Sequence, residues 1–251
     1  MLLRIESVGR TYKLGVQTVS ALTNVSLDID EGAFIAIAGP SGSGKSTLLN
    51  LIGLIDTPTS GRLLIDDRDV SRRTPDDLSE LRARTIGFVF QTFNLLPVLT
   101  ARENVEYPLL QFPELTPQER RERVAKYLEL VKLTRYAKHR PNQLSGGQRQ
   151  RVAIARALAT HPRLVLADEP TANLDHRTGA RILRLMRKIN RIHGTTFIFS
   201  THDPRVLELA DRRVDLEDGK IVRLGVRDGD QWRYAFDRSS IEPGGPGRDA
   251  K

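Results

Sequence analysis

A glycine-rich stretch that contains one lysine has the residue types needed to bind phosphate groups. The stretch GPSGSGKST matches the pattern G-x-x-x-x-G-K-[ST] in full, after an apolar run and before a helical pattern. Its glycines let backbone N–H groups converge on phosphate oxygens, and the helix N-terminus adds partial positive charge. Lys45 can reach the β- and γ-phosphates of a nucleoside triphosphate, and the Ser46 hydroxyl is the expected Mg²⁺ ligand. We therefore expect a triphosphate site made by Gly39, Pro40, Ser41, Gly42, Ser43, Gly44, Lys45, Ser46 and Thr47.

Two adjacent acids follow a second apolar run. RLVLAD (163–168) is typical of a buried strand that ends at Asp168, and Glu169 comes next. Because open α/β sheets bind ligands at the carboxyl ends of their strands, we expect Asp168 to face the phosphate loop and to bind Mg²⁺ through water. Glu169 is the candidate general base for an attacking water. The alternative, helix capping or solvated loop charge, is less favoured beside a phosphate loop.

A second helix start follows Leu144 in the sequence LSGGQ. Ser145 and Gln148 have the spacing of a capping box, and Gly146 and Gly147 leave backbone N–H groups exposed. An ordinary helix cap is one interpretation. A second anion site is the other, because free N–H groups, a helix dipole and a hydroxyl would all point outward.

The elements that must position these residues alternate between strands and helices. Buried-strand patterns occur at 34–38, 86–91, 163–168 and 195–200, and a helix is expected over Lys45–Ile55. The sequence therefore predicts an α/β fold built largely from βα units. Val25, Leu27 and Ile29 alternate with polar residues, as in a half-exposed antiparallel strand. Asp218-Gly219 lies between two alternating runs and predicts a type I′ hairpin.

Between residues 92 and 162 the pattern becomes helical. Thr100 with Glu103 and Thr116 with Glu119 have capping-box spacing, and Pro117 suits the first helical position. We interpret this segment as a helical subdomain inserted into the α/β core. At the other end of the chain, the PGGPG sequence that starts at Pro243 predicts a loose C-terminus.

Composition excludes several classes of protein. The 251 residues include 39 Lys and Arg against 31 Asp and Glu, a net charge of +8, and no cysteine. The absence of cysteine rules out disulfides, thiolate metal sites and cysteine nucleophiles. No apolar run approaches the roughly 18 residues of a membrane span. The basic surplus gathers at 120–140 and at helical spacing over 177–191, which favours solvated helix faces over a nucleic-acid partner.

Together, the phosphate loop, LSGGQ and LVLADEP resemble the ATP-binding subunits of ABC transporters over about residues 1–225. The resemblance implies a P-loop NTPase core, with a mixed sheet flanked by helices, an N-terminal antiparallel β subdomain and the inserted α-helical subdomain at about 92–162. Residues 226–251 would form a C-terminal extension, partly disordered from about 242. The family pairs head to tail, so Ser145, Gly146, Gly147 and Gln148 of one chain would close over ATP held by the other.

Four further residues receive roles from the same resemblance. Gln91 is similar to the glutamine that contacts Mg²⁺ and relays nucleotide state to the helical subdomain, and His202 resembles the histidine that contacts the γ-phosphate. Asp175 resembles an aspartate at the dimer interface, and Tyr12 stands where an aromatic ring stacks on adenine. The implied catalytic set is Glu169, His202 and Gln91, and the implied Mg²⁺ ligands are Ser46, Gln91 and Asp168. Ordinary packing remains the alternative for Tyr12, and a simple loop position for His202.

The phrases around these motifs are similar to a narrower branch of the family. YKLGVQTVSALTNVSLDI and FQTFNLLPVLTARENVEYPLL resemble the lipoprotein-release (LolD-like) and macrolide or peptide export (MacB-like) ATPases, with the cell-division FtsE-like proteins nearby. That resemblance implies a separate membrane permease, docked on Gln91 and the segment Asn94–Glu103, and a peripheral position on the cytoplasmic face of the cell membrane. Repair- or chromosome-class ATPases of the same family carry coiled coils or zinc modules, for which this chain has neither heptads nor cysteines. Export, lipoprotein release and membrane signalling remain open.

Overall fold

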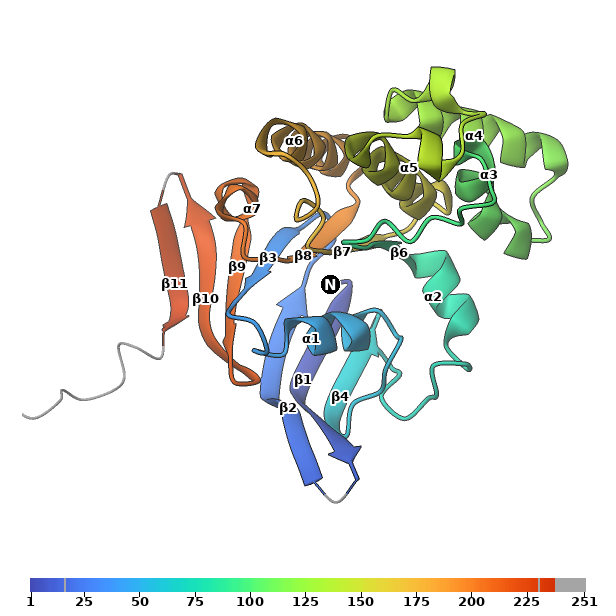
Figure 1. Ribbon diagram of the computed structural model, residues 1–251. Coiled ribbons are helices and arrows are strands. Elements are labelled where there is room, and N and C mark those ends of the chain that lie inside the picture. The colour runs from blue at the N-terminus through green and yellow to red at the C-terminus, as the bar shows by residue number, and fades with distance from the viewer. Residues whose placement is uncertain (16, 230, 238–251) are drawn as a thin grey trace, which may run out of the picture.

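Two sheets and a layer of helices form the molecule (Figure 1). The computed structural model describes residues 1–15, 17–229 and 231–237. In this part of the chain, a mixed sheet has the order β11-β10-β9-β3-β8-β7-β6 and an antiparallel sheet has the order β2-β1-β4-β5. The strands are β1 (Leu3–Leu14), β2 (Gln17–Ile29), β3 (Phe34–Ala38), β4 (Ser60–Ile65), β5 (Arg68–Asp69), β6 (Ile86–Val89), β7 (Leu164–Asp168), β8 (Thr196–Ser200), β9 (Arg212–Glu217), β10 (Lys220–Asp228) and β11 (Gln231–Asp237).

The helices lie between these strands in the chain. They are α1 (Lys45–Ile52), α2 (Ser79–Thr85), α3 (Ala101–Glu106), α4 (Pro117–Leu130), α5 (Gly146–Ala159), α6 (His176–His193) and α7 (Pro204–Leu209), with 3-10 turns η1 (Tyr107–Gln111), η2 (Thr134–Tyr136) and η3 (Pro141–Gln143). Three capping boxes start helices where the sequence predicted them: Thr100 with Glu103, Thr116 with Glu119 and Ser145 with Gln148. None of the helices in the described residues has both the length and the apolar character of a membrane span.

The parallel strands of the mixed sheet are buried on both faces. Phe34 and Ala36 of β3 belong to one core with α5 and α6, whereas Ile35 and Ile37 belong to a second core with α1 and the antiparallel sheet. Successive side chains of a strand point to opposite faces, so a continuous apolar run supplies two cores at once. The α/β expectation is confirmed, and the mixed sheet lies between these two cores, with α5 and α6 on one side and α1 on the other (Figure 1).

The pairing register brings the carboxyl ends of three strands together. Ser200 of β8 pairs with both Ile37 of β3 and Asp168 of β7, and all three strands are parallel. The segments that follow these strands therefore leave the sheet at the same edge. This edge carries the phosphate loop, Glu169 and the residues after β8.

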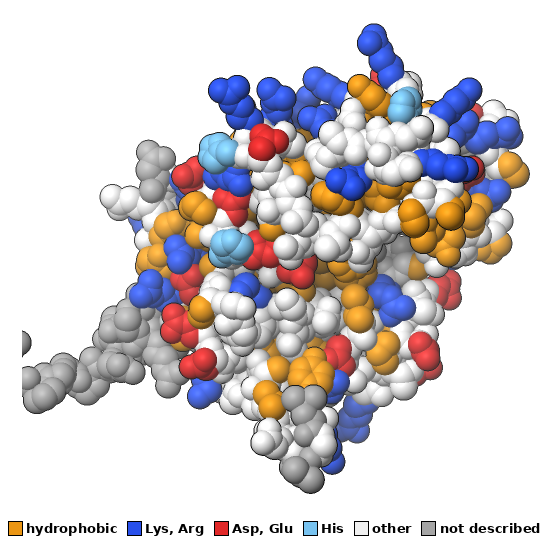
Figure 2. Space-filling model, in the orientation of Figure 1, with side chains coloured by type: hydrophobic (Ala, Val, Ile, Leu, Met, Phe, Trp, Pro, Cys, Tyr) orange, Lys and Arg blue, Asp and Glu red, His pale blue; other side chains and the backbone are white. Residues whose placement is uncertain are grey.

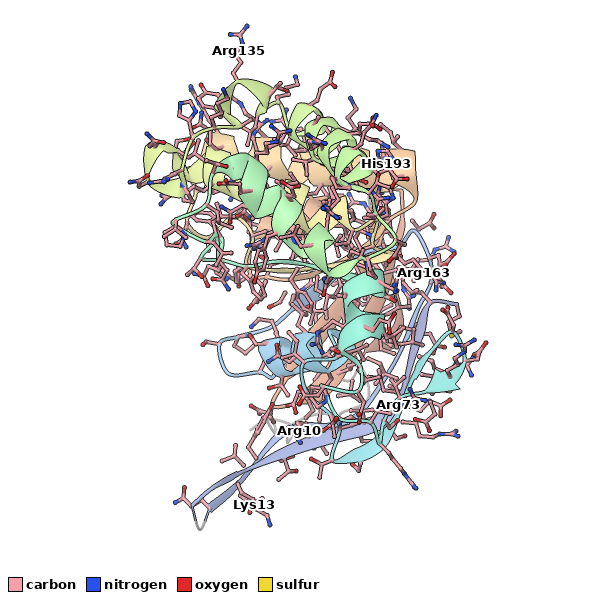
Figure 3. The ribbon with its side chains drawn as sticks, turned by 90° about the vertical axis from the view of Figure 1, so that its right-hand side faces the viewer. Arg10, Lys13, Arg73, Arg135, Arg163 and His193 are labelled. Carbon is pink, nitrogen blue, oxygen red and sulfur yellow. The ribbon has the colours of Figure 1, made fainter. Side chains whose placement is uncertain are left out.

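A charged contact joins the two sheets at the opposite end of β7. Arg163 donates to Glu31 (Nε–Oε1 3.1 Å) and to Asp66 (Nη2–Oδ1 2.9 Å), which follow β2 and β4 (Figure 3). The solvated face predicted over 177–191 is also confirmed, because Ile182, Met186 and Ile189 are buried while the five cations predicted for that face are exposed: Arg177, Arg181, Arg184, Lys188 and Arg191. Lys and Arg side chains project outward from the helical layer, at the top of the view in Figure 2.

Two boundaries differ from expectation, and one turn is confirmed. Helix α1 ends at Ile52, three residues before Ile55, because the chain turns at Gly53 and Leu54 has a left-handed φ of 55°. Strand β6 ends at Val89 instead of residue 91. Asp218 and Gly219 have φ values of 44° and 73°, as a type I′ turn requires. Beyond residue 225, β11 pairs antiparallel with β10, and the expected loose tail lies outside the described residues.

Candidate functional site

A cleft of about 620 Å³ opens at the carboxyl edge of the mixed sheet. It is lined by most of the phosphate loop and by Gln91, Asp168, Glu169 and His202. They lie at or just beyond the carboxyl ends of four strands, β3, β6, β7 and β8. The sheet topology therefore gathers residues that lie far apart in the sequence. Sequence reasoning did not anticipate the remaining lining residues, which are Val19, Ser20, Ala21, Ala172 and Ser200.

The phosphate loop has the backbone that its glycines permit. Gly39, Gly42 and Gly44 have φ values of 152°, 81° and 101°, in the region that favours glycine. The Lys45 Nζ donates to the carbonyl oxygens of Gly39 (2.8 Å) and Pro40 (2.7 Å) and so lies across the loop. The N–H groups at the start of α1 and the Lys45 ammonium together favour the binding of a polyphosphate.

Gly39 tolerates no side chain. A Cβ there would lie 2.1 Å from the Leu216 carbonyl oxygen and 2.7 Å from the Ser43 Oγ. We expect Gly39→Ala to reduce the free energy of unfolding by about 1–3 kcal/mol and to weaken ATP binding. Gly194→Ala is the matched control, since Gly194 also has a left-handed φ, of 66°, but open space around it. Urea unfolding of both variants makes the comparison, and equal stabilities would contradict the packing argument.

Glu169 and His202 form a hydrogen-bonded pair in the cleft. The His202 Nδ1 lies 2.7 Å from the Glu169 Oε1, and the Thr201 Oγ1 donates to the Glu169 Oε2 at 3.2 Å. The Glu169 side chain is 16% exposed whereas that of His202 is 78% exposed. Glu169 has a left-handed φ of 44°, a sparsely populated conformation for a residue other than glycine. His202 is therefore linked directly to Glu169, and both residues line the cleft together with Asp168.

The predicted metal ligands share the same cleft. Ser46, Gln91 and Asp168 all line it and offer only oxygen donors, the type that Mg²⁺ prefers. Among the described residues no group of three or more His, Asp or Glu side chains could hold a metal ion by itself. The oxygen donors of Ser46, Gln91 and Asp168 fit Mg²⁺, which protein side chains commonly hold together with water and substrate phosphates.

The LSGGQ residues lie outside the cleft, at the start of α5. The Ser145 Oγ accepts from the Gln148 N–H (3.3 Å), and the Gln148 Oε1 accepts from the Ser145 N–H (2.8 Å). A Cβ on Gly147 would lie 2.4 Å from the Thr178 Cγ2, so this glycine allows α6 to approach. The predicted capping box is confirmed, and none of these residues lines the phosphate loop's cleft of the same chain.

Asp175 and Tyr12 have local partners in the structure. Asp175 caps α6 by accepting from the Thr178 N–H at 3.0 Å, and hydrogen bonding from Thr178 lowers the pKa of Asp175. The Tyr12 hydroxyl donates to the Asp56 Oδ2 at 2.7 Å, and the Arg10 guanidinium lies 4.6 Å from the centre of its ring. Tyr12 itself does not line the cleft, but its cross-strand neighbour Val19 does.

A network behind His202 was not visible in the sequence. Asp203 accepts from the Thr171 Oγ1 (2.8 Å) and the Arg205 Nη2 (2.6 Å), and Arg205 also donates to the His176 carbonyl (2.8 Å). Burial raises the pKa of Asp203, but hydrogen bonds from Arg205 and Thr171 outweigh it and lower that pKa overall. Only the Asp-Pro helix start signalled this position. The network ties the His202 loop to the start of α6.

Comparisons with known proteins agree with this geometry. A family model described as "ABC transporter" matches residues 22–172. The chain is 48% identical over 225 residues to the uncharacterized ABC transporter ATP-binding protein MJ0796 of Methanocaldococcus jannaschii, covering 88% of this chain and 96% of that one. It is also 48% identical over 221 residues to the macrolide export ATP-binding/permease protein MacB of Brucella melitensis, covering 88% of this chain and 34% of that protein.

The fold is similar to a solved cassette as well. A dimeric post-hydrolysis structure of MJ0796 bound to ADP and Pi has a TM-score of 0.83 and 47% identity, covering 91% of this chain and all of that one. With this coverage, and with the mixed and antiparallel sheets described above, the predicted fold class is confirmed. The chain belongs to the ABC transporter family and is one of its ATP-binding cassettes, which are P-loop ATPases.

Proposed function

We propose that the chain is the ATP-hydrolysing subunit of a transporter of the export or lipoprotein-release type, acting as a head-to-tail homodimer on a separate membrane permease. The observation that carries this proposal is the division of the site: the cleft holds the phosphate loop and the Glu169–His202 pair, while Ser145 lies apart on α5. A second chain would supply the missing side. The dimeric MJ0796 structure with ADP and Pi supports this arrangement.

Binding begins at the phosphate loop. Backbone N–H groups of Gly42–Thr47 and the Lys45 ammonium would hold the phosphates, with Lys45 moving from the carbonyls of Gly39 and Pro40 to phosphate oxygens. Mg²⁺ would be held by Ser46, Asp168 and Gln91, and when bound it offsets the negative charge between the β- and γ-phosphates. Thr47 lines the same cleft and adds a second hydroxyl next to Ser46.

Hydrolysis would depend on the Glu169–His202 pair. Glu169 accepts a hydrogen bond from Thr201, which orients its carboxylate, and this carboxylate would take a proton from an attacking water. His202, hydrogen-bonded to the same carboxylate through Nδ1, has its other ring nitrogen free to meet the γ-phosphate. Ser145, Gly146, Gly147 and Gln148 of the partner chain would stabilise the charge on that phosphate.

Loss of the γ-phosphate would then open the dimer. The phosphate bridges the cleft of one chain and α5 of the other, so the closed state binds ATP more tightly than ADP. Asp175 is the N-cap of α6, and the start of this helix packs against Gly147. We place Asp175 at the dimer interface. We assign residues 1–225 to the ATP-binding domain, with its helical subdomain at about 92–162, and 226–251 to an extension whose β11 continues the mixed sheet.

The permease would bind on the membrane side, with the cassette peripheral on the cytoplasmic face. The segment Asn94–Glu103 and η1 expose apolar side chains, among them Val98 at 72%, Tyr107 at 57% and Leu110 at 57% exposed. Exposed apolar groups gathered on one side of a monomer favour a protein partner. The MacB relative is named as both ATP-binding protein and permease, and this chain matches only about a third of it.

Substitutions of Tyr12 test directly how the adenine ring of ATP is bound. If its ring stacks on adenine, Tyr12→Ala should raise the Kd for ATP about tenfold, whereas inorganic triphosphate should bind as before. Tyr12→Phe keeps the ring but loses the bond to Asp56, so its affinity for ATP should stay within about twofold of that of the unmodified chain. Isothermal titration of the two ligands separates the cases. Equal losses for ATP and triphosphate would contradict the stacking role.

A further inference from the structure

The loop after β8 holds both chain neighbours of His202. The His202 side chain is 78% exposed, so its own packing does little to fix where the ring points. Thr201, the residue before it, is buried, and its hydroxyl donates to Glu169 (Oγ1–Oε2 3.2 Å). Asp203, the residue after it, donates its backbone N–H to the same Thr201 oxygen at 2.9 Å. The position of His202 therefore depends on what anchors this loop.

Arg205 anchors the loop through Asp203. The Arg205 Nε donates to both carboxylate oxygens of Asp203 (2.9 and 3.0 Å), and its Nη2 donates to Oδ2 at 2.6 Å. The Thr171 hydroxyl donates to the same Oδ2 at 2.8 Å. The Asp203 side chain is only 11% exposed, so these charge-assisted bonds form where little water competes for the carboxylate. Such bonds hold a side chain in one geometry.

Arg205 also joins the loop to the start of α6. Its Nη1 donates to the carbonyl of His176 at 2.8 Å, and His176 follows Asp175, the N-cap of that helix. A Cβ on Gly179 would lie 3.0 Å from the Arg205 Nη1 and 3.1 Å from Nη2, so this glycine makes room for the guanidinium over the first turn of α6. The loop that carries His202 is thus fixed to a helix that begins beside Asp175.

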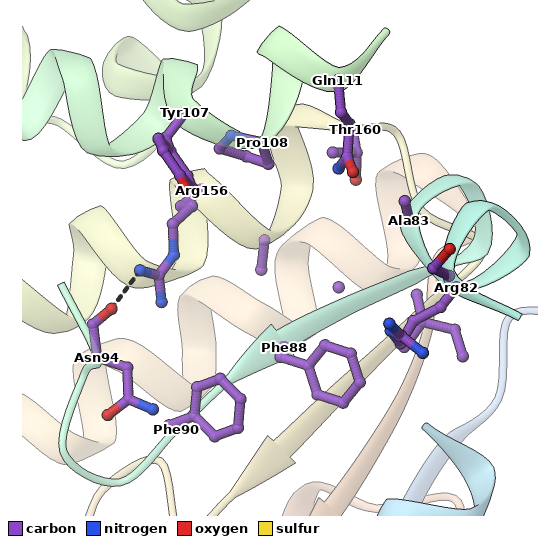
Figure 4. Close-up of a pocket in the computed structure, with 14 residues that line it drawn as sticks. Arg82, Ala83, Phe88, Phe90, Asn94, Tyr107, Pro108, Gln111, Arg156 and Thr160 are labelled. Carbon is purple, nitrogen blue, oxygen red and sulfur yellow. Dashed lines mark hydrogen bonds between the residues drawn. The ribbon is translucent and has the colours of Figure 1, made fainter. Parts of the chain in front are cut away.

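The loop that carries Gln91, on another side of the cleft, is held by a different arginine. Arg156 of α5 donates to the Asn94 carbonyl, as Figure 4 shows. None of the residues that line the groove in that figure belongs to the Arg205 network. The two loops are therefore anchored separately, and a change at Arg205 is expected to act on the His202 side of the cleft.

We propose that Arg205 is a positioning residue for ATP hydrolysis: by holding Asp203 against α6, it keeps His202 where it can meet the γ-phosphate. The inference rests on the proposed function, which gives His202 that contact, and it adds a residue outside the motifs described above. Arg205 does not line the nucleotide cleft, so its effect on the reaction passes through the loop. A misplaced group lowers the rate of the chemical step even where the ligand still binds.

Steady-state kinetics of the full-length chain test this role. Arg205→Gln should lower kcat about tenfold and change KM for ATP less than about twofold, because the phosphate loop is untouched. Arg205→Lys should recover part of the loss, since it keeps the charge but lacks the planar fork that bonds Asp203 and the His176 carbonyl together. Arg184→Gln, exposed on α6, is the matched control and should keep the normal kcat. A normal kcat for Arg205→Gln would overturn the proposal.

Gly179→Ala separates positioning from folding. Alanine is favoured over glycine inside a helix, but its Cβ would press on the Arg205 guanidinium. We expect this variant to unfold thermally at or above the temperature of the unmodified chain and yet to have a kcat about threefold lower. This comparison stands even if the Arg205 variants do not fold. A stable Gly179→Ala chain with unchanged kcat would overturn the role assigned to the guanidinium.

A double-mutant cycle shows whether Arg205 acts through His202. His202→Ala should lower the single-turnover rate, and adding Arg205→Gln should lower it less than about twofold further, because the ring to be positioned is gone. Losses that multiply in full would overturn the inference. The proposed function would fail separately, if His202→Ala alone hydrolysed ATP at the rate of the unmodified chain.

Discussion

Replacing Glu169 by glutamine is expected to lower ATP turnover by about 10²- to 10³-fold while ATP binding is retained. Glutamine keeps the size of the side chain and can still accept from Thr201, but it cannot take a proton from water. The Glu169 carboxylate also holds His202 at 2.7 Å, so the substitution weakens the orientation of that ring. Both effects act on the chemical step, since the phosphate-loop donors are untouched.

Single-turnover hydrolysis and equilibrium ATP titration measure the two quantities separately. Glu208→Gln, on the exposed face of α7, is the matched control and should hydrolyse ATP at the rate of the unmodified chain. Near-normal turnover by Glu169→Gln would remove Glu169 as the general base. A parallel loss of ATP affinity would instead indicate that Glu169 maintains the cleft.

Ser145→Arg is expected to abolish hydrolysis and to leave ATP binding unchanged. Ser145 lies outside the nucleotide cleft of its own chain, so a bulky cation there cannot affect the phosphate loop directly. In a head-to-tail dimer the same side chain would block the contact between α5 and the ATP of the partner. A residue that is remote from the site within one chain is then essential to it in the assembly.

Loss of the helix cap must be separated from loss of the dimer contact. The Ser145 hydroxyl caps α5, and removing such a cap costs about 1 kcal/mol in stability. Ser145→Ala loses the cap without adding bulk, so its stability should match that of Ser145→Arg while much more of its activity remains. Thermal unfolding and steady-state ATPase assays of the two variants make this comparison. Equal activities would show that only the cap matters.

Local patterns in the sequence were sufficient to predict much of the fold. The phosphate-loop turn, the capping boxes and the Asp218-Gly219 hairpin depend on neighbouring residues, and the structure confirms each of them. The parallel sheet followed from continuous apolar runs, because burial on both faces requires them. The end of α1 was less predictable, since Leu54 is fully buried in a left-handed turn that its apolar character did not reveal.

Contacts between distant residues could not be predicted in the same way. The Glu169–His202 bond joins residues that are 33 positions apart, and the Asp203–Thr171 bond joins residues 32 apart. Both depend on the register of β7 with β8, which no local signal specifies. The hydrogen bond from Tyr12 to Asp56 is a third contact of this kind. It joins residues 44 positions apart and forms only because the fold brings β1 next to the end of α1.

In the proposed assembly, ATP joins two copies of this chain through the cleft of one and α5 of the other. The mass of Glu169→Gln in solution, measured by light scattering with and without Mg·ATP, tests it most directly. One chain has a mass of 28.2 kDa. We expect the mass of one chain without nucleotide, twice that mass with Mg·ATP, and the mass of one chain again when Ser145→Arg is added to Glu169→Gln. A single-chain mass with ATP, or a dimer that Ser145→Arg leaves intact, would contradict it.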